Sequence, residues 1–275
     1  MQYIQPISPI SSCVKPAGNL KKNIKCILFD IYGTLFVSSS GDISISRKKS
    51  VKQLQVKNLL EKYKIYSDPN QISSELFYQI EKKHEELRKN GVDFAEVEID
   101  KIWQNVCKDL GADTAKYFAA EYEMIVNPVY PMPFLNQVID ECKSLNLLMG
   151  IISNAQFYTK YLFEWFLDRD LQELGFETEL IFFSYKLGYA KPSVYLFNLA
   201  ANKIKDMGID KNSVLYVGND MLNDIYPAKK VGFSTALFAG DKRSLRLRNK
   251  DVRCKEMKPD IVITDLNQLI YHIKT

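Results

Sequence analysis

The chain has 275 residues, of which 46% are hydrophobic and 25% are charged. These fractions are typical of a folded globular protein and exclude a disordered or low-complexity chain. The formal net charge of +4 comes from 37 basic and 33 acidic residues, an excess too slight to indicate nucleic acid as a partner. The length suffices for one large α/β domain that carries an insert.

The cysteines and the apolar segments indicate the cellular compartment of the protein. The five Cys residues are odd in number, far apart and without a CxxC pair, a pattern that indicates free thiols in a reducing compartment. The sequence has no uncharged apolar run of about 18 residues, and its N-terminal segment lacks the pattern of a signal peptide. We therefore expect a cytoplasmic protein with no membrane partner.

The first elements are an arm, a strand and a helical insert. Residues 1–24 contain three prolines and no clear period, which predicts an extended arm. Residues 25–30 form a short apolar run that ends on Asp30, as expected for a buried parallel strand that opens into a loop. From 37 to 130 the chain turns to amphipathic stretches over 51–66, 72–90 and 97–110, so we expect helices there.

After residue 131 helical and strand patterns alternate. The predicted helices are 133–145, 157–174, 192–207 and 222–231, and the predicted strands are 147–152, 180–183, 213–217, 235–238 and 261–263. Such alternation predicts a Rossmann-like parallel sheet covered by helices on both faces. We expect an α/β core made of residues 1–36 and 131–275, with residues 37–130 as an inserted helical cap domain.

Polar side chains follow four of the predicted strands, where ligands of parallel sheets gather. They are Asp30, Ser153-Asn154, Lys191, and Gly218-Asn219-Asp220 with Asp224 a turn later. Each group alone could be a helix cap or a turn. Their succession along the strands predicts one common site.

These segments resemble the four motifs of the haloacid dehalogenase-like (HAD) hydrolases. Asp30–Leu35 looks like the first motif, Ser153-Asn154 the second, Lys191-Pro192 the third and Gly218–Asp224 the fourth. The helical insert matches in position the cap called C1 in that family. The resemblance covers nearly the whole core and implies a hydrolase that acts on a small anionic substrate through a covalent aspartyl intermediate.

The residue types fit those roles chemically. Asp30 can act as the nucleophile and divide one displacement into two easier steps. Lys191 can offset carboxylate repulsion and stabilise developing negative charge. Thr34, Ser153 and Asn154 can bind the anionic oxygens of the transferred group.

A Mg²⁺ site is expected beside the nucleophile. Because Mg²⁺ prefers about six oxygens and keeps several waters, Asp30, the main-chain oxygen of Tyr32 and Asp224 could supply its protein ligands. Phosphatases of the family carry an acidic residue where this chain has Asn219, which is followed by Asp220. Either Asn219 binds the metal through its amide oxygen or Asp220 takes its place.

Tyr32 is the main departure from the phosphatase pattern, which has a second aspartate there as general acid. The same aromatic replacement is typical of 2-haloacid dehalogenases, which need neither that proton nor a metal. Asp220 and Asp224 are retained, however, and this favours a Mg²⁺-dependent phosphatase. Tyr32 or a cap residue could donate the proton instead, or Tyr32 could only pack against the cap. A catalytically weak HAD-fold binding protein is a further alternative.

Other features give weaker indications. In the cap, Arg88 could reach an anionic substrate, whereas His84 is expected on a solvated helix. The basic stretch 241–248 could steer an anionic substrate or bind a partner, but we favour an exposed turn. The dense aromatics of 158–166 predict core packing, with a cap contact or a homodimer contact as alternatives.

Overall fold

The computed structural model describes residues 6–20, 23–39 and 53–274, and its central feature is a seven-stranded sheet. The strand order is β1-β9-β8-β7-β2-β5-β6, and every neighbouring pair is parallel except β1 with β9. The strands are β1 Ala17–Gly18, β2 Cys26–Phe29, β5 Leu148–Ser153, β6 Phe176–Phe183, β7 Val214–Gly218, β8 Ser234–Phe238 and β9 Ile261–Ile263. The predicted Rossmann-like α/β core is confirmed.

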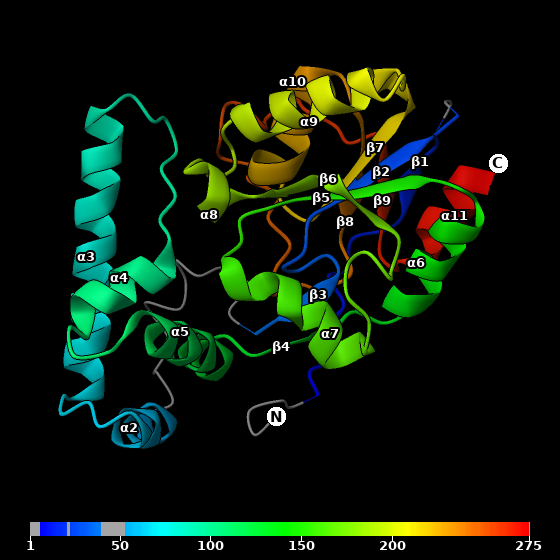
Figure 1. Ribbon diagram of the computed structural model, residues 1–275. Helices are drawn as coiled ribbons and strands as arrows, with labels where there is room; N and C mark the ends of the chain where they lie inside the picture. Colours follow the sequence, from blue (N-terminus) through cyan, green and yellow to red (C-terminus); the bar gives the residue numbers. More distant parts are fainter. Residues whose placement is uncertain (1–5, 21–22, 40–52, 275) are drawn as a thin grey trace.

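Helices cover both faces of this sheet (Figure 1). On one face, α6 (Leu135–Ser144), α7 (Tyr161–Leu167) and α11 (Asn267–Lys274) share a hydrophobic core with Ile27 and Phe29. On the other, α9 (Tyr195–Asp206) and α10 (Tyr226–Val231) pack with Cys26 and Leu28. Alternate residues of β2 therefore face opposite helix layers, which explains why this strand is apolar throughout.

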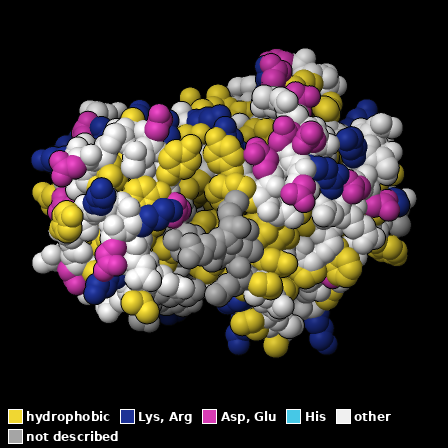
Figure 2. Space-filling view, turned by 60° about the horizontal axis from the view of Figure 1, so that its bottom comes forward, with side chains coloured by type: hydrophobic (Ala, Val, Ile, Leu, Met, Phe, Trp, Pro, Cys, Tyr) yellow, Lys and Arg dark blue, Asp and Glu magenta, His cyan; other side chains and the backbone are white. Residues whose placement is uncertain are grey.

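The helical insert lies between two short strands, β3 (Phe36–Ser38) and β4 (Val129–Pro131), which pair antiparallel. Its described helices are α2 Gln53–Lys62, α3 Pro69–Lys89, α4 Ile99–Val106 and α5 Ala112–Val126. They surround a hydrophobic core of their own and form a separate lobe beside the sheet (Figure 1). Figure 2 shows hydrophobic side chains gathered in the hollow between the two lobes.

Three of the predicted segments have a different structure from the one expected. The helix expected over 157–174 is a 3-10 turn, Phe157–Lys160, followed by α7, which ends where Asp168 adopts a left-handed conformation with φ of 53°. The helix expected over 222–231 begins with a π-helical turn, Met221–Ile225. The arm contributes β1 to the sheet, a pairing too short to leave a pattern in the sequence.

The structure also bears on the short elements, the aromatic stretch and the cysteines. Several elements fall outside every predicted range: α5, β3, β4, and the two short helices α8 (Ser184–Leu187) and Lys211–Ser213. Phe163, from the aromatic stretch, is fully buried in the core, so the predicted core packing is confirmed there, while a homodimer stays a prediction. All five cysteines are free thiols. None of the helices in the described ranges is both long and apolar enough to cross a membrane.

The insert core centres on Trp103, which is 1% exposed and packs edge-on against Phe118 and Tyr122. We expect Trp103→Ala to lower the free energy of unfolding by about 3–5 kcal/mol, because removing a buried indole leaves a large cavity. Urea denaturation followed by circular dichroism measures this change. Tyr117→Ala, at an aromatic residue of α5 that is 69% exposed, is the control. Equal losses in the two variants would contradict this account of the insert.

Candidate active site

The candidate site lies at the carboxyl end of β2, the strand between β5 and β7. Asp30 follows β2 directly, Ser153 ends β5 and Gly218 ends β7. Because the register pairs Phe29 with Ile151 and with Val217, these three strand ends meet at one edge. The chain runs outward from β2 to β5 and β6 and then returns to β7 on the other side, so the site occupies the topological switch point of the sheet.

Asp30 is buried, and its two carboxylate oxygens differ in environment. Its Oδ1 atom accepts hydrogen bonds from Ser153 Oγ at 2.8 Å and from Lys191 Nζ at 2.7 Å. Its Oδ2 atom receives no hydrogen bond from any described residue, and Asp30 lines a cavity. One oxygen is thus fixed by two donors, while the other is available to a ligand.

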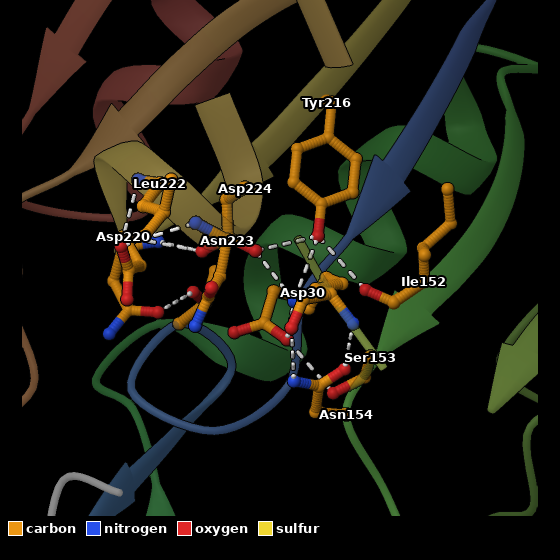
Figure 3. Close-up of polar contacts among 12 residues, drawn as sticks. Asp30, Ile152, Ser153, Asn154, Tyr216, Asp220, Leu222, Asn223 and Asp224 are labelled. Carbon is orange, nitrogen blue, oxygen red and sulfur yellow. Dashed lines mark hydrogen bonds and ion pairs between the residues drawn. The ribbon is translucent and has the colours of Figure 1, made fainter. Parts of the chain in front are cut away.

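Lys191 joins Asp30 to a second buried carboxylate. Its Nζ atom lies 2.5 Å from Asp224 Oδ1 and 3.2 Å from the Tyr216 hydroxyl. Tyr216 donates to Asp224 or to the main-chain oxygen of Ile152, and Figure 3 shows its hydroxyl between these groups. Burial, only partly offset by Lys191, raises the pKa of Asp224 to about 7. Burial opposes protonation of Lys191, but the two carboxylates outweigh it and raise its pKa.

The main chain of Lys191 is held by Asn154. The Lys191 N–H donates to Asn154 Oδ1 at 2.7 Å, and Asn154 Nδ2 donates to the Lys191 carbonyl at 3.3 Å. The two predicted residues therefore lie together, but the amide of Asn154 is largely used in placing the lysine.

Asn219 is fixed as an amide rather than a carboxylate. Its Nδ2 atom donates to the Ser244 carbonyl at 2.7 Å, and its Oδ1 atom accepts from Thr34 Oγ1 at 3.3 Å. An aspartate here would place a carboxylate oxygen against the Ser244 carbonyl. Gly33, with φ of 83°, lies against both Asn219 and Ser244, and a Cβ atom there would collide with them.

Asp220 is occupied by other protein groups. Arg248 binds its carboxylate in a bidentate manner, with Nε 3.0 Å from Oδ1 and Nη2 2.6 Å from Oδ2. The same carboxylate accepts from the N–H groups of Leu222 and Asn223 and caps the π-helical turn (Figure 3). Asp224 is equally engaged, because its Oδ2 atom accepts from the N–H groups of Asn219 and Asp220.

Tyr32 points to a threonine rather than to a free acid. Its hydroxyl forms a 2.9 Å hydrogen bond with Thr159 Oγ1. Burial, together with the negative charges of Glu123 and Asp30, raises the pKa of Tyr32 above its ordinary value. A phenol that holds its proton so firmly is a poor general acid.

These groups surround a small cavity of about 100 Å³. Seven of the predicted residues line it: Asp30, Tyr32, Asn154, Lys191, Asn219, Asp220 and Asp224. Ser38, Asn127 and Asn223 also line it and were not singled out in the sequence. Ser244 and Arg246 line it too. They belong to the basic stretch 241–248, which was expected to be an exposed turn, but Asp241 and Ser244 are buried. Since a water molecule takes up about 30 Å³ in the liquid, the cavity has room for roughly three waters or for a small organic anion.

Three predicted residues are not among the described residues that line this cavity. Thr34 is fully buried behind it on Asn219, and Ser153 is buried against Asp30. Arg88, on α3, has a half-exposed side chain that lies 3.8 Å from Glu81. His84 lies on the same helix, 3.9 Å from Glu81.

A magnesium ion would find few protein ligands here. No group of three or more His, Cys, Asp or Glu side chains in the described part of the chain is arranged to hold a metal ion. The oxygens of the predicted ligand set that no basic side chain binds are Asp30 Oδ2, Asn219 Oδ1, which accepts from Thr34, and the main-chain oxygen of Tyr32. This set fits a Mg²⁺ ion that keeps most of its water ligands.

Comparison with known proteins assigns the family. The family model described as haloacid dehalogenase-like hydrolase matches residues 24–232, so the chain belongs to this family of hydrolases. An uncharacterized hydrolase of Schizosaccharomyces pombe is 25% identical over 227 residues, or 78% of this chain and 90% of that protein.

Two further similarities point to different chemistries. Glyceraldehyde 3-phosphate phosphatase of Methanocaldococcus jannaschii is 24% identical over 273 residues, which cover 91% of this chain and 97% of that protein. A crystal structure of a 2-haloacid dehalogenase from Pseudomonas syringae superposes with a TM-score of 0.57 at 16% identity and covers 91% of this chain and 98% of that chain. The second similarity shows a shared fold, and neither similarity decides which of the two activities this chain has.

We expect Lys191→Met to lower the free energy of unfolding at neutral pH by about 3–5 kcal/mol, because it leaves two buried carboxylates without their cation. The loss should be smaller in acid. This follows from Asp224, whose pKa is raised in the folded protein. Its protonated form contributes stability that is fully present below the unfolded-state pKa of about 4 and is lost as the pH rises through the folded-state pKa.

Urea unfolding of Lys191→Met at several pH values checks this expectation. Lys186→Met, at an exposed lysine of α8, is the matched control and should unfold as the wild type does. A loss that does not depend on pH would contradict the account.

Proposed function

We propose that this protein is a Mg²⁺-dependent phosphatase of small phosphorylated metabolites, with Asp30 as the nucleophile. The observation that carries the proposal is the asymmetry of the Asp30 carboxylate. Ser153 and Lys191 hold one oxygen, while the other has no protein partner among the described residues. Such an oxygen is positioned for attack.

The reaction proceeds in two steps. Asp30 Oδ2 attacks phosphorus, and an aspartyl phosphate forms as the bond to the leaving oxygen breaks. Water then attacks phosphorus, which releases inorganic phosphate and regenerates Asp30. The ammonium group of Lys191 offsets the negative charge that gathers on the phosphoryl oxygens in both steps.

A bound Mg²⁺ ion would supply further positive charge for these oxygens. Asp30, Asn219 and the main-chain oxygen of Tyr32 would hold it. The side chains of Asp220 and Asp224 would act indirectly, since Arg248 and Lys191 already bind them. Residues 37–130 would serve as the cap that closes over the site and excludes water.

Proton donation is the limiting feature of this site. The titratable side chains that line the cavity are Tyr32, the nucleophile, Lys191, Arg246 and two acids bound to cations. None of these is an uncommitted acid near the leaving oxygen. The site therefore suits leaving groups that depart as anions, such as acyl or aryl oxygens, better than it suits alkoxides.

The same feature supports a second candidate function, metal-independent dehalogenation of a 2-haloacid. Halide leaves without a proton, so the lack of a general acid at Tyr32 would not slow the reaction. Asp30 would then attack carbon, and water would open the resulting ester. A catalytically weak binding protein is the third candidate, and it predicts turnover no faster than that of Asp30→Asn.

Turnover of acyl and aryl phosphates should require both Asp30 and Mg²⁺. We expect acetyl phosphate and p-nitrophenyl phosphate to be hydrolysed with Mg²⁺, and the rate to fall by at least about a thousandfold in Asp30→Asn, because the covalent route is lost. Excess chelator should abolish wild-type activity. Chloride release from 2-chloropropionate in chelator, without phosphatase activity, would overturn the proposal in favour of the dehalogenase.

The leaving-group dependence should change in Tyr32→Asp. An added carboxyl acid is expected to raise the rate on alkyl phosphates by about tenfold or more and to leave p-nitrophenyl phosphate nearly unaffected. Rates on a series of aryl and alkyl phosphates of graded leaving-group pKa measure this. Tyr32→Phe is the control and should keep the wild-type dependence. If Tyr32→Phe instead lost activity selectively on alkyl phosphates, the hydroxyl would be the acid after all.

A further inference from the structure

Four arginines lie in the loop between β8 and β9, and three of them are matched by aspartates, among them Arg253, whose Nη2 atom lies 2.8 Å from Asp251 Oδ2. Arg243 Nε lies 3.1 Å from Asp241 Oδ1, and Arg248 binds Asp220 in a bidentate manner. Arg246 makes no ion pair with any acidic residue in the described part of the chain. It is also the one arginine of these four that lines the active-site cavity.

The main chain of Arg246 is fixed against the fourth motif. Its N–H donates to the Asn219 carbonyl at 3.0 Å, and its carbonyl accepts from the Met221 N–H at 2.8 Å. The residue is therefore anchored to the same segment that carries Asn219, Asp220 and Asp224. These two main-chain hydrogen bonds restrict where the Arg246 side chain can lie in the cavity wall.

The guanidinium group of Arg246 is only partly used by the protein. Its Nη1 atom donates to the carbonyls of Arg243 at 2.6 Å and Leu245 at 3.1 Å. Its other N–H groups have no hydrogen-bond partner in the described ranges, although the residue is half-buried. A half-buried cation without a counter-charge is costly unless a ligand or water supplies one.

The cavity thus contains two cations of different kinds. Lys191 is already shared by Asp30 and Asp224, so it serves the reacting centre. Arg246 is not committed to a carboxylate of the described chain and can receive an anion from the substrate. Its planar guanidinium matches the geometry of an oxyanion with two adjacent oxygens.

We propose that Arg246 binds a second anionic group of the substrate, a carboxylate, while the phosphate ester lies at Asp30. The inference rests on the proposed function and specifies its substrate class as small acyl or aryl phosphates that carry a carboxylate. The cavity of about 100 Å³ favours a three-atom carboxylate over a second phosphate group. Arg246 is thus a specificity-determining residue rather than part of the phosphoryl-transfer machinery.

The test compares two aryl esters that differ in one charge: 3-carboxyphenyl phosphate and its isosteric amide, 3-carbamoylphenyl phosphate. Their phenolate leaving groups depart without a general acid. Values of kcat and KM are measured for wild type, Arg246→Gln and Lys242→Gln. The last is a control that removes an exposed charge of the same loop. Benzene-1,3-diol bisphosphate is the comparison that carries a second phosphate group in place of the carboxylate. Thermal stabilisation by each ester is measured in the Asp30→Asn variant, so that binding has a readout independent of turnover.

We expect the wild type to prefer the carboxylate ester over the amide by roughly ten- to a hundredfold in kcat/KM, as one charged hydrogen-bonded contact allows. Arg246→Gln should remove that preference mainly through KM, and should leave the amide ester within about threefold of wild type. Lys242→Gln should behave as wild type. In the binding assay, stabilisation by the carboxylate ester should exceed that by the amide and should depend on Arg246.

Other outcomes separate this inference from the proposed function. Turnover of both esters without preference would overturn the carboxylate subsite while leaving the phosphatase intact. Equal losses on both esters in Arg246→Gln would mean that the arginine serves the phosphoryl group or only supports its loop. A preference for the bisphosphate would identify a phosphate subsite instead. Absence of turnover together with Arg246-dependent binding of the carboxylate would retain the subsite and reject the phosphatase.

Discussion

The buried ammonium group of Lys191, held between Asp30 and Asp224, is the interaction on which the rest of the site depends. It lies 2.7 Å from one carboxylate and 2.5 Å from the other, and without it two negative charges would be buried side by side. Asn154 fixes its main chain, and Tyr216 shares Asp224 with it. The first, second, third and fourth motifs are thereby tied to one cation at the edge of the sheet.

This arrangement changes the roles that acidic residues can take. Asp224 receives four protein donors and Asp220 is bound by Arg248, so neither carboxylate is available as a direct metal ligand without rearrangement. The oxygen of Asp30 that faces the cavity is the one carboxylate oxygen of these three residues with no protein partner in the described ranges. With Tyr32 hydrogen-bonded to Thr159, the site can attack and stabilise charge well but lacks a proton donor.

Sequence reasoning located the strand ends because buried parallel strands and the polar residues after them leave local patterns. It did not find Tyr216, whose hydroxyl projects from an otherwise apolar strand, nor the loop contacts of Ser244 and Arg246, which depend on long-range packing. It left Asn219 and Asp220 as equal alternatives because the pairing of Asp220 with Arg248 spans 28 positions. Arg88 was proposed from its charge alone, and that charge did not indicate which way the helix face points.

The central claim, that Asp30 is a phosphoryl-accepting nucleophile, is tested most directly by trapping its intermediate. Wild-type protein is mixed with excess acetyl phosphate and Mg²⁺, quenched in acid and digested, and its peptides are analysed by mass spectrometry. The account predicts one phosphoryl group on the peptide that contains Asp30, assigned to that residue by fragmentation and missing in Asp30→Asn. A phosphoryl group on another residue, or hydrolysis with no adduct at Asp30 at any quench time, would contradict it.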